Sequence, residues 1–298
     1  MIFTLLGTGT SHGIPQIACD CAVCTSTDIC DRRTRCSALI QANAGSPGAK
    51  NILIDCAPDF HEQARHARIT SIDALLLTHS HADHLHGLDD LRVFSHKFKA
   101  SGGLPLYSNR KTLDDVKSRF SYVFKSTQQG GGKPNLRLIP CETFTYDNPL
   151  RIDGTNIEIV YIPIKHGEII CAGWVITETK RIVYSKTSWD FAHSLDSHSV
   201  AYLTDCNFIS DESIKKIKKA ATNLDYVIID ALRQRDHSTH FNFDQALECA
   251  LKIGGKKTLF THICHDTSHK DIAVWLSKKD TPPDMSFAPA YDGWTVTL

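Results

Sequence analysis

The chain has 298 residues, with 33 basic and 33 acidic side chains and 42% hydrophobic residues. This length and composition can bury a sizeable core, and the formal net charge of zero argues against a general binder of polyanions. The longest apolar runs fall well short of the roughly 18 residues that a membrane span requires. The first residues, MIFTLLGTGTS, are too short and glycine-rich for a signal peptide. We therefore predict a cytoplasmic protein with no membrane partner.

Short β-branched and apolar runs alternate with segments of helical periodicity along the whole chain. Strands are predicted at Ile2–Leu6, Ala38–Gln41, Asn51–Asp55, Ala74–Thr78, Ile157–Ile162, Ala172–Thr177, Arg181–Tyr184, Ala201–Thr204, Tyr226–Ile229, Thr258–Thr261 and Trp294–Leu298. Helices are predicted at His61–Ala67, Leu85–Lys99, Thr112–Phe124, Asp211–Asn223, Phe243–Ile253 and His269–Lys278. Because the two kinds of element mix without a break, we predict one α/β domain over residues 1–298, with two face-to-face sheets and helices outside.

The segment CDCAVC brings three cysteines together near the N-terminus: Cys19, Cys21 and Cys24. Three thiolates in one loop of a cytosolic protein are typical of a structural zinc site, which needs a fourth ligand to complete a tetrahedron. His265, in THICHD, is a candidate for that ligand, and Cys30 and Cys36 compete with it. The sequence thus predicts a zinc knuckle at residues 19–24.

Residues 101–135 differ from the rest of the chain in composition. They contain SGG, a predicted helix and then STQQGGGKPN. The glycines and polar residues of this last segment predict a mobile loop. The region is either a flap over a functional site or a solvent-exposed insertion, and the sequence leaves both interpretations open.

Four histidines and an aspartate crowd into LLLTHSHADHLHG, at residues 75–87. If the extended chain continues past the preceding strand, His79 and His81 project to the same side, and Asp83 and His84 follow at the turn into a helix. Such a loop offers ligands to two neighbouring metal ions, and its imidazoles and carboxylate suit Zn²⁺, Mn²⁺ or Fe²⁺. His86 falls outside this spacing.

The segment THSHADH matches the HxHxDH signature of the metallo-β-lactamase superfamily, whose fold is a four-layered αββα sandwich. Further ligands of that superfamily lie at strand ends, and His166 in PIKHGE, Asp205 in VAYLTD and His262 in KTLFTH each follow a predicted strand. The resemblance implies that Asp55, in ILIDCAPDF, orients the loop of residues 79–86, called the histidine loop below. It also implies two ligand sets: His79, His81 and His166 for one metal, and Asp83, His84 and His262 for the other, with Asp205 as a bridge.

Three longer segments resemble the PhnP-type branch, which acts on phosphoribosyl cyclic phosphate: LGTGTSHGIPQIACDCAVC, DCAPDF and DALRQRDHSTHFNFDQAL. This resemblance implies a zinc held by Cys19, Cys21, Cys24 and His265 beside two catalytic divalent metals, Mn or Zn. It implies that His240 is the general acid that protonates a departing alkoxide. Asp230 ends the preceding predicted strand and is a candidate to orient either His240 or the metal ligands, and His237 is expected at the surface.

The resulting hypothesis is a phosphodiesterase that opens a small cyclic phosphate, with a metal-bridging hydroxide as nucleophile and with Asp83 and Asp205 in the catalytic centre. The positive charge left in such a cleft favours a small anionic phosphodiester. A tRNA 3′-processing nuclease is disfavoured by the neutral charge, and a lactonase or thioesterase has no need of His240. A PqqB-like cofactor-biosynthesis or binding protein with a degraded site is disfavoured by the complete ligand set. Relatives of this type commonly pair, so we expect a homodimer.

Overall fold

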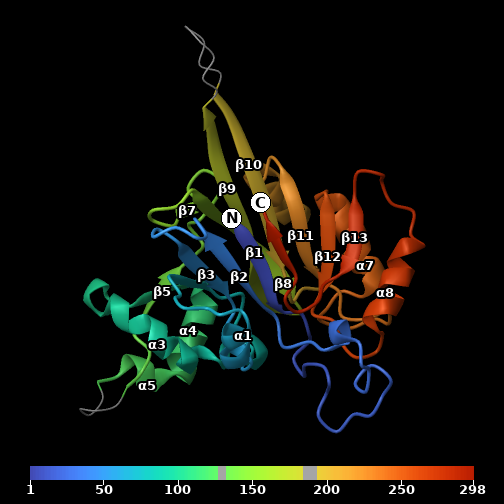
Figure 1. Ribbon diagram of the computed structural model, residues 1–298, viewed down its shortest axis with the longest axis horizontal. Coiled ribbons are helices and arrows are strands. Elements are labelled where there is room, and N and C mark those ends of the chain that lie inside the picture. The colour runs from blue at the N-terminus through green and yellow to red at the C-terminus, as the bar shows by residue number, and fades with distance from the viewer. Residues whose placement is uncertain (127–131, 184–192) are drawn as a thin grey trace.

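The computed structural model describes residues 1–126, 132–183 and 193–298. Two mixed sheets of seven strands each lie face to face with helices on their outer sides (Figure 1). The first sheet has the order β14-β1-β2-β3-β4-β5-β6, and the second has the order β13-β12-β11-β10-β9-β8-β7. This arrangement confirms the predicted αββα sandwich.

The elements have the following bounds. The first sheet contains β1 (Ile2–Gly7), β2 (Ser37–Ala42), β3 (Lys50–Ile54), β4 (Ala74–Leu76), β5 (Leu104–Ser108), β6 (Leu136–Pro140) and β14 (Thr295–Thr297). The second contains β7 (Leu150–Arg151), β8 (Ile157–His166), β9 (Ile169–Val183), β10 (His193–Leu203), β11 (Leu224–Asp230), β12 (Lys257–Thr261) and β13 (Ser286–Pro289). The α-helices are α1 (Phe60–His66), α2 (Ala82–Leu85), α3 (Arg92–Ser95), α4 (Arg110–Arg119), α5 (Ser121–Phe124), α6 (Asp211–Ala220), α7 (Phe243–Ile253) and α8 (His269–Ser277). Short 3₁₀ turns are η1 (Ile29–Asp31), η2 (Leu88–Leu91) and η3 (His96–Ser101).

Three apolar clusters hold these layers together. Between the sheets, Phe3 and Ile40 of the first sheet share one buried cluster with Trp174 and Tyr202 of the second. A second cluster joins the outer face of the first sheet to α1 and α4, and a third joins the second sheet to α6, α7 and α8. Burial of each large apolar side chain contributes about 1.5–3 kcal/mol, so the sheets form a firm base for the loops at their ends.

The predicted helix at Leu85–Lys99 is wrong, because the structure divides this stretch into α2, η2, α3 and η3. The break falls at Gly87, whose N–H donates to the carbonyl of Cys56 (2.9 Å), and the Cys56 N–H donates to the carbonyl of His84 (2.8 Å). These bonds tie the histidine loop to the segment after β3, and they replace helical bonds at this point. Likewise, the run predicted separately at Arg181–Tyr184 continues β9 as far as Val183, and Tyr184 lies outside the described residues.

We expect that Gly87→Ala will destabilise the protein by about 1–3 kcal/mol, the usual cost of overpacking a filled interior. A Cβ at this position would lie 2.0 Å from the backbone oxygen of Ala57, which has little freedom to move. Thermal unfolding measures the effect, with Gly48→Ala as a reference, because a Cβ at Gly48 would lie 3.8 Å from the nearest atom, the Ser46 hydroxyl, and its φ is not left-handed. An unchanged melting temperature for Gly87→Ala would contradict the close backbone approach.

Residues 101–135 are largely part of the sandwich, which corrects the expectation of an insertion or flap. They include β5, whose five residues are all buried and which pairs with β4 and β6 in the first sheet. The prediction missed β5 because Pro105 interrupts a short apolar run, and it also missed β6, β7 and β13. Residues 127–131, in the loop expected to be mobile, lie outside the described residues. Among the helices of the described residues, none is long and apolar enough to cross a membrane.

Candidate functional site

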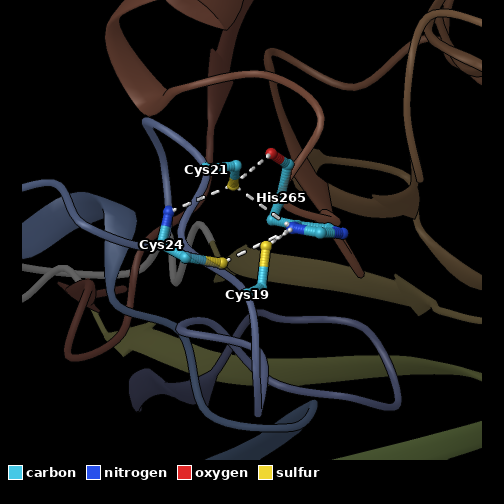
Figure 2. A group of neighbouring side chains, drawn as sticks. All are labelled: Cys19, Cys21, Cys24 and His265. Carbon is cyan, nitrogen blue, oxygen red and sulfur yellow. Dashed lines mark hydrogen bonds between the residues drawn. The ribbon is translucent and has the colours of Figure 1, made fainter.

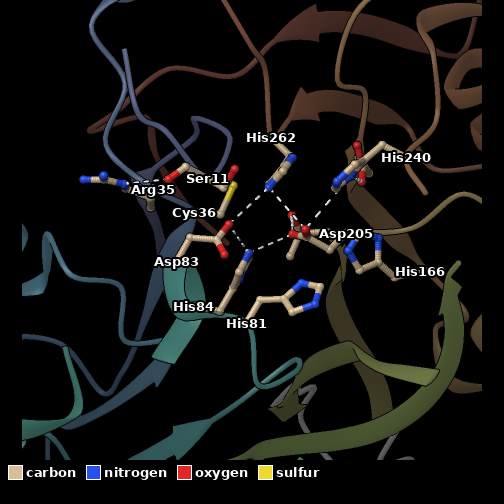
Figure 3. Close-up of polar contacts among 12 residues, drawn as sticks. Ser11, Arg35, Cys36, His81, Asp83, His84, His166, Asp205, His240 and His262 are labelled. Carbon is tan, nitrogen blue, oxygen red and sulfur yellow. Dashed lines mark hydrogen bonds and ion pairs between the residues drawn. The ribbon is translucent and has the colours of Figure 1, made fainter. Parts of the chain in front are cut away.

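Strand ends from both sheets meet at one place and direct polar side chains toward each other (Figure 3). The histidine loop follows β4, His166 ends β8, Asp205 follows β10 and His262 follows β12. Asp55, Asp205 and His262 all have left-handed backbone conformations, with φ of 58°, 54° and 58°. Such conformations cost about 1–3 kcal/mol each in residues other than glycine, and they concentrate at functional sites. The strand ends are therefore bent at the residues that point into this space.

One group of ligand atoms consists of three imidazoles, from His79, His81 and His166, all within 4.8 Å of one another. The His166 Nδ1–H donates to the carbonyl of Thr239 at 2.7 Å, which leaves a lone pair on Nε2. Burial lowers the pKa of His79 well below its usual range, and burial also lowers the pKa of His166. Neutral imidazole is the form that binds a metal ion, so this group suits a divalent cation.

The second group consists of four buried residues, Asp83, His84, Asp205 and His262, again within 4.8 Å of one another. One carboxylate oxygen of Asp205 lies 2.9 Å from His84 Nε2, and the other lies 3.2 Å from His262 Nε2. Within the described part of the chain, neither of these two nitrogens has a hydrogen-bond partner. Buried nitrogens that face carboxylates without hydrogen-bond geometry fit a shared cation.

The two groups adjoin, since the rings of His79 and His84 lie 4.4 Å apart. Asp55 supports them from behind, because its carboxylate accepts from His84 Nδ1 and from the backbone N–H of Thr78, each at 2.7 Å. Burial opposes the charged form of His84, but Asp205, Asp83 and Asp55 outweigh it and raise the pKa of His84 well above its usual range. A proton on His84 thus offsets part of the negative charge of these carboxylates, and a divalent cation would offset more of it. Asp55 lies where the resemblance implied.

His240 lies beside both groups and is held by Asp230. The ligand atoms of Asp205, Asp230, His240 and His262 also lie within 4.8 Å of one another. The rings of His166 and His262 are each 4.5 Å from the ring of His240. His240 Nδ1 is 2.6 Å from a carboxylate oxygen of Asp230, which also accepts from the Cys206 N–H at 2.8 Å. Burial lowers the pKa of His240. Because Nδ1 is engaged, Nε2 is the atom left for a reacting group.

The start of α7 fixes the backbone next to His240. Asn242 accepts from the Gln245 N–H at 2.8 Å, and the Gln245 side chain accepts from the Asn242 N–H at 2.9 Å, which is a capping box. His237, expected at the surface, is instead partly buried, with its ring 5.1 Å from that of His240. Its place beside His240 was not evident from the sequence, because nothing in HSTH shows which way the loop turns. His86 is exposed and lies outside both ligand groups.

The loop that carries Cys19, Cys21 and Cys24 lies against the loop between β12 and α8, and its thiols surround one nitrogen of His265 (Figure 2). The sulfurs of Cys19, Cys21 and Cys24 lie 3.3, 3.4 and 3.4 Å from His265 Nδ1. An imidazole nitrogen has either one lone pair or one proton, so it cannot bond to three thiols at once. A tetrahedral zinc between the four atoms would satisfy all of them. The other candidate Cys36 is buried elsewhere, against Gly9 and Thr261.

We expect Cys21→Ser to lose one tightly bound zinc and to lower the melting temperature, whereas Cys30→Ser keeps both at wild-type values. The backbone N–H of Cys24 donates to Cys21 and lowers the pKa of its thiol to about 6. A lowered thiol pKa favours the folded state above the ordinary thiol range, and that contribution is lost as the pH falls through about 6. Zinc should therefore be retained at neutral pH and released on acidification, as a chromophoric chelator can measure. Equal zinc content in the two variants would exclude the knuckle.

Comparison with known proteins agrees with this fold and site. A family model described as a beta-lactamase superfamily domain matches residues 50–263. The chain therefore belongs to the metallo-β-lactamase superfamily. A crystal structure of a diphosphatase from the PhnP family is 34% identical to this chain, covers 99% of it and 96% of its own chain, and has a TM-score of 0.76. This similarity places the chain in the PhnP family.

Two curated relatives match only part of their own length. An octanoyltransferase of Porphyromonas gingivalis is 36% identical over 262 residues, which are 88% of this chain and 45% of that protein. Coenzyme PQQ synthesis protein B of Klebsiella pneumoniae is 27% identical over 162 residues, which are 49% of this chain and 48% of that protein. The chain thus spans about half the length of the curated relatives it matches. Fold, family and ligand geometry together indicate a hydrolase with candidate metal-binding residues.

Proposed function

We propose that this protein is a dinuclear metal-dependent phosphodiesterase that opens a small cyclic phosphate of the phosphoribosyl type. The observation that carries the proposal is the pair of adjoining ligand groups around Asp205, with His240 directly beside them. Two divalent cations there, Mn²⁺ or Zn²⁺, would lower the pKa of water and stabilise charge on phosphoryl oxygens. The two ligand groups contain only two carboxylates, Asp83 and Asp205, so the loaded cleft would stay positive and favour an anionic substrate.

His240 acts in this proposal on the leaving group. Opening a sugar cyclic phosphate expels an alkoxide, which leaves readily only when it is protonated as it departs. Asp230 fixes the His240 ring through Nδ1, so that Nε2 is the nitrogen left to donate a proton. In this proposal His240 protonates the leaving group and does not hold metal.

The Cys19, Cys21, Cys24 and His265 group is proposed to hold a structural zinc. His265 comes three residues after His262 in the same loop. A zinc at this place would tie the loop after β1 to the loop that carries His262, and it would supply folding energy that an irregular segment lacks.

Hydrolysis of a diphosphate is the second candidate, because the similar crystal structure is called a diphosphatase. The leaving group would then be a phosphate, which is stable as an anion and needs little help from an acid. The fixed position of His240 favours an ester with an alkoxide leaving group instead.

Acyl transfer, suggested by the octanoyltransferase relative, has less support. That name belongs to a protein of which this chain spans 45%. Acyl transfer through an enzyme nucleophile commonly uses an ionised thiol or an activated amine. Burial raises the pKa of Cys36 to about 12, and it raises the pKa of Cys171 and Cys206 well above the usual range. These three thiols near the site therefore remain protonated.

A substrate screen tests the proposed function. Cyclic phosphodiesters, linear phosphodiesters and diphosphates would be compared with and without chelator, followed by addition of Mn²⁺ or Zn²⁺. The proposal expects the highest kcat/KM for a cyclic phosphodiester, abolished by chelation and restored by metal. Preference for diphosphates would support the second candidate, and hydrolysis of thioesters or lactones alone would overturn both.

A further inference from the structure

Ser80 lies between two candidate metal ligands, His79 and His81, and is held from the side opposite to them. Its hydroxyl donates to a carboxylate oxygen of Asp115 at 2.7 Å. Its carbonyl accepts a hydrogen bond from the Arg119 guanidinium. Asp115 and Arg119 are four residues apart on α4 and therefore share one face of that helix. One helix thus holds the hydroxyl and the carbonyl of the residue between the two histidines.

The helix that makes these contacts is itself fixed to both sheets. Asn109 caps α4 by accepting from the Thr112 N–H at 2.9 Å, and its side-chain amide donates to the carbonyl of Ile170 in β9, also at 2.9 Å. Ser108, at the end of β5, donates to the carbonyl of Leu77 at 2.7 Å, close to the histidine loop. Because α4 is fixed in this way, its position determines the position of the loop that carries His79 and His81.

His81 depends on this support more than His79 and His166, the other two ligands of its group, do. His79 has a contact with Thr78, His166 with Thr239 and His84 with Asp55. Among the described residues, the ring of His81 has no hydrogen-bond partner other than His79. The orientation of the His81 ring therefore follows from the backbone on either side of it, and Ser80 is its neighbour.

We propose that Asp115 and Arg119 are positioning residues that clamp Ser80 and thereby set the metal affinity of the group formed by His79, His81 and His166. This inference rests on the metal centre of the proposed function but does not depend on its substrate. Contacts that orient metal ligands typically change metal affinity by about 10–100-fold when they are removed. The clamp should act selectively, because its contacts reach the backbone between His79 and His81, whereas His84 of the second ligand group is bonded directly to Asp55.

The test is metal binding by the full-length protein, measured by competition between Zn²⁺ and a chromophoric chelator. We expect Asp115→Ala to weaken one of the two catalytic sites about 10–100-fold, with the other site and the cysteine-bound zinc unchanged. Asp114→Ala is the matched control, because Asp114 is an exposed carboxylate on the same helix. Ser80→Ala should reproduce the loss, and the double variant should lose no more than either single one, since both remove the same contact.

Thermal unfolding of each variant shows whether it is folded, and Arg119→Gln provides an independent variant if Asp115→Ala is not. Equal Zn²⁺ affinity in Asp115→Ala and Asp114→Ala, or an equal loss at both catalytic sites, would overturn the clamp. A wild-type protein that binds both metals but hydrolyses no phosphodiester would refute the proposed substrate class and leave this test intact.

Discussion

Asp205→Asn is expected to abolish phosphodiesterase activity and to remove at least one of the two catalytic metals. Each carboxylate oxygen of Asp205 approaches a different imidazole, at 2.9 Å from His84 and 3.2 Å from His262, and the side chain is buried. Asparagine keeps the shape but removes the negative charge and one of the two acceptor oxygens. Loss of a contact that only orients a metal ligand usually weakens metal binding about 10–100-fold. We expect a larger loss of metal affinity for Asp205→Asn.

Metal content by elemental analysis and kcat with saturating Mn²⁺ measure this effect. Asp225→Asn is the matched control, since Asp225 is also a buried aspartate of the second sheet but pairs with Lys256 and His198 at the other end of β11. We expect the control to keep its metals even if its stability falls. An Asp205→Asn protein with two bound metals and wild-type turnover would refute the shared role of this carboxylate.

His240→Ala should reduce kcat about 10²–10⁴-fold on substrates that expel an alkoxide, with unchanged metal content. The reason is geometric: His240 adjoins both ligand groups, and although its Nδ1 lies within 4.8 Å of ligand atoms of Asp205 and His262, this nitrogen is bonded to Asp230 at 2.6 Å. Loss of a proton donor matters only where the leaving group is a strong base. The same variant should therefore lose much less activity on bis(p-nitrophenyl) phosphate, whose leaving group is stable as an anion.

The comparison between the two substrates is the control for His240, because both need the same metals and differ in the leaving group. Asp230→Asn should lower kcat on the two substrates in the same pattern as His240→Ala, because it removes the bond that fixes the His240 ring. Equal losses on both substrates, or loss of metal from the His240→Ala protein, would show that His240 serves the metal centre instead of the leaving group.

The αββα fold was predictable because buried strands carry strong local signals, and the strands that were missed lack them. β5 contains a proline, β7 has only two residues, and β6 and β13 lie at or near sheet edges with partly exposed side chains. The helix predicted at Leu85–Lys99 has suitable periodicity, but Gly87 must approach the backbone of Ala57 closely. That requirement comes from tertiary packing, which the local sequence does not record.

The candidate site was predictable to different degrees. His79, His81, Asp83 and His84 stand close together in the sequence, so their pattern alone indicated metal binding. His166, Asp205 and His262 are single residues at strand ends, and only resemblance to a known family distinguished them from ordinary polar residues. The contacts of Asp115 and Arg119 with Ser80 span 35 and 39 residues of sequence and belong to no motif, so they became visible only in the structure.

The central claim is that strand ends from both sheets hold two neighbouring cations in one cleft. After chelation, Mn²⁺ titrated into the protein and followed by electron paramagnetic resonance tests this claim most directly. We expect two Mn²⁺ per chain with an exchange-coupled spectrum, and loss of that coupling in Asp205→Asn. A single Mn²⁺ per chain, or two ions with no magnetic coupling, would contradict the account.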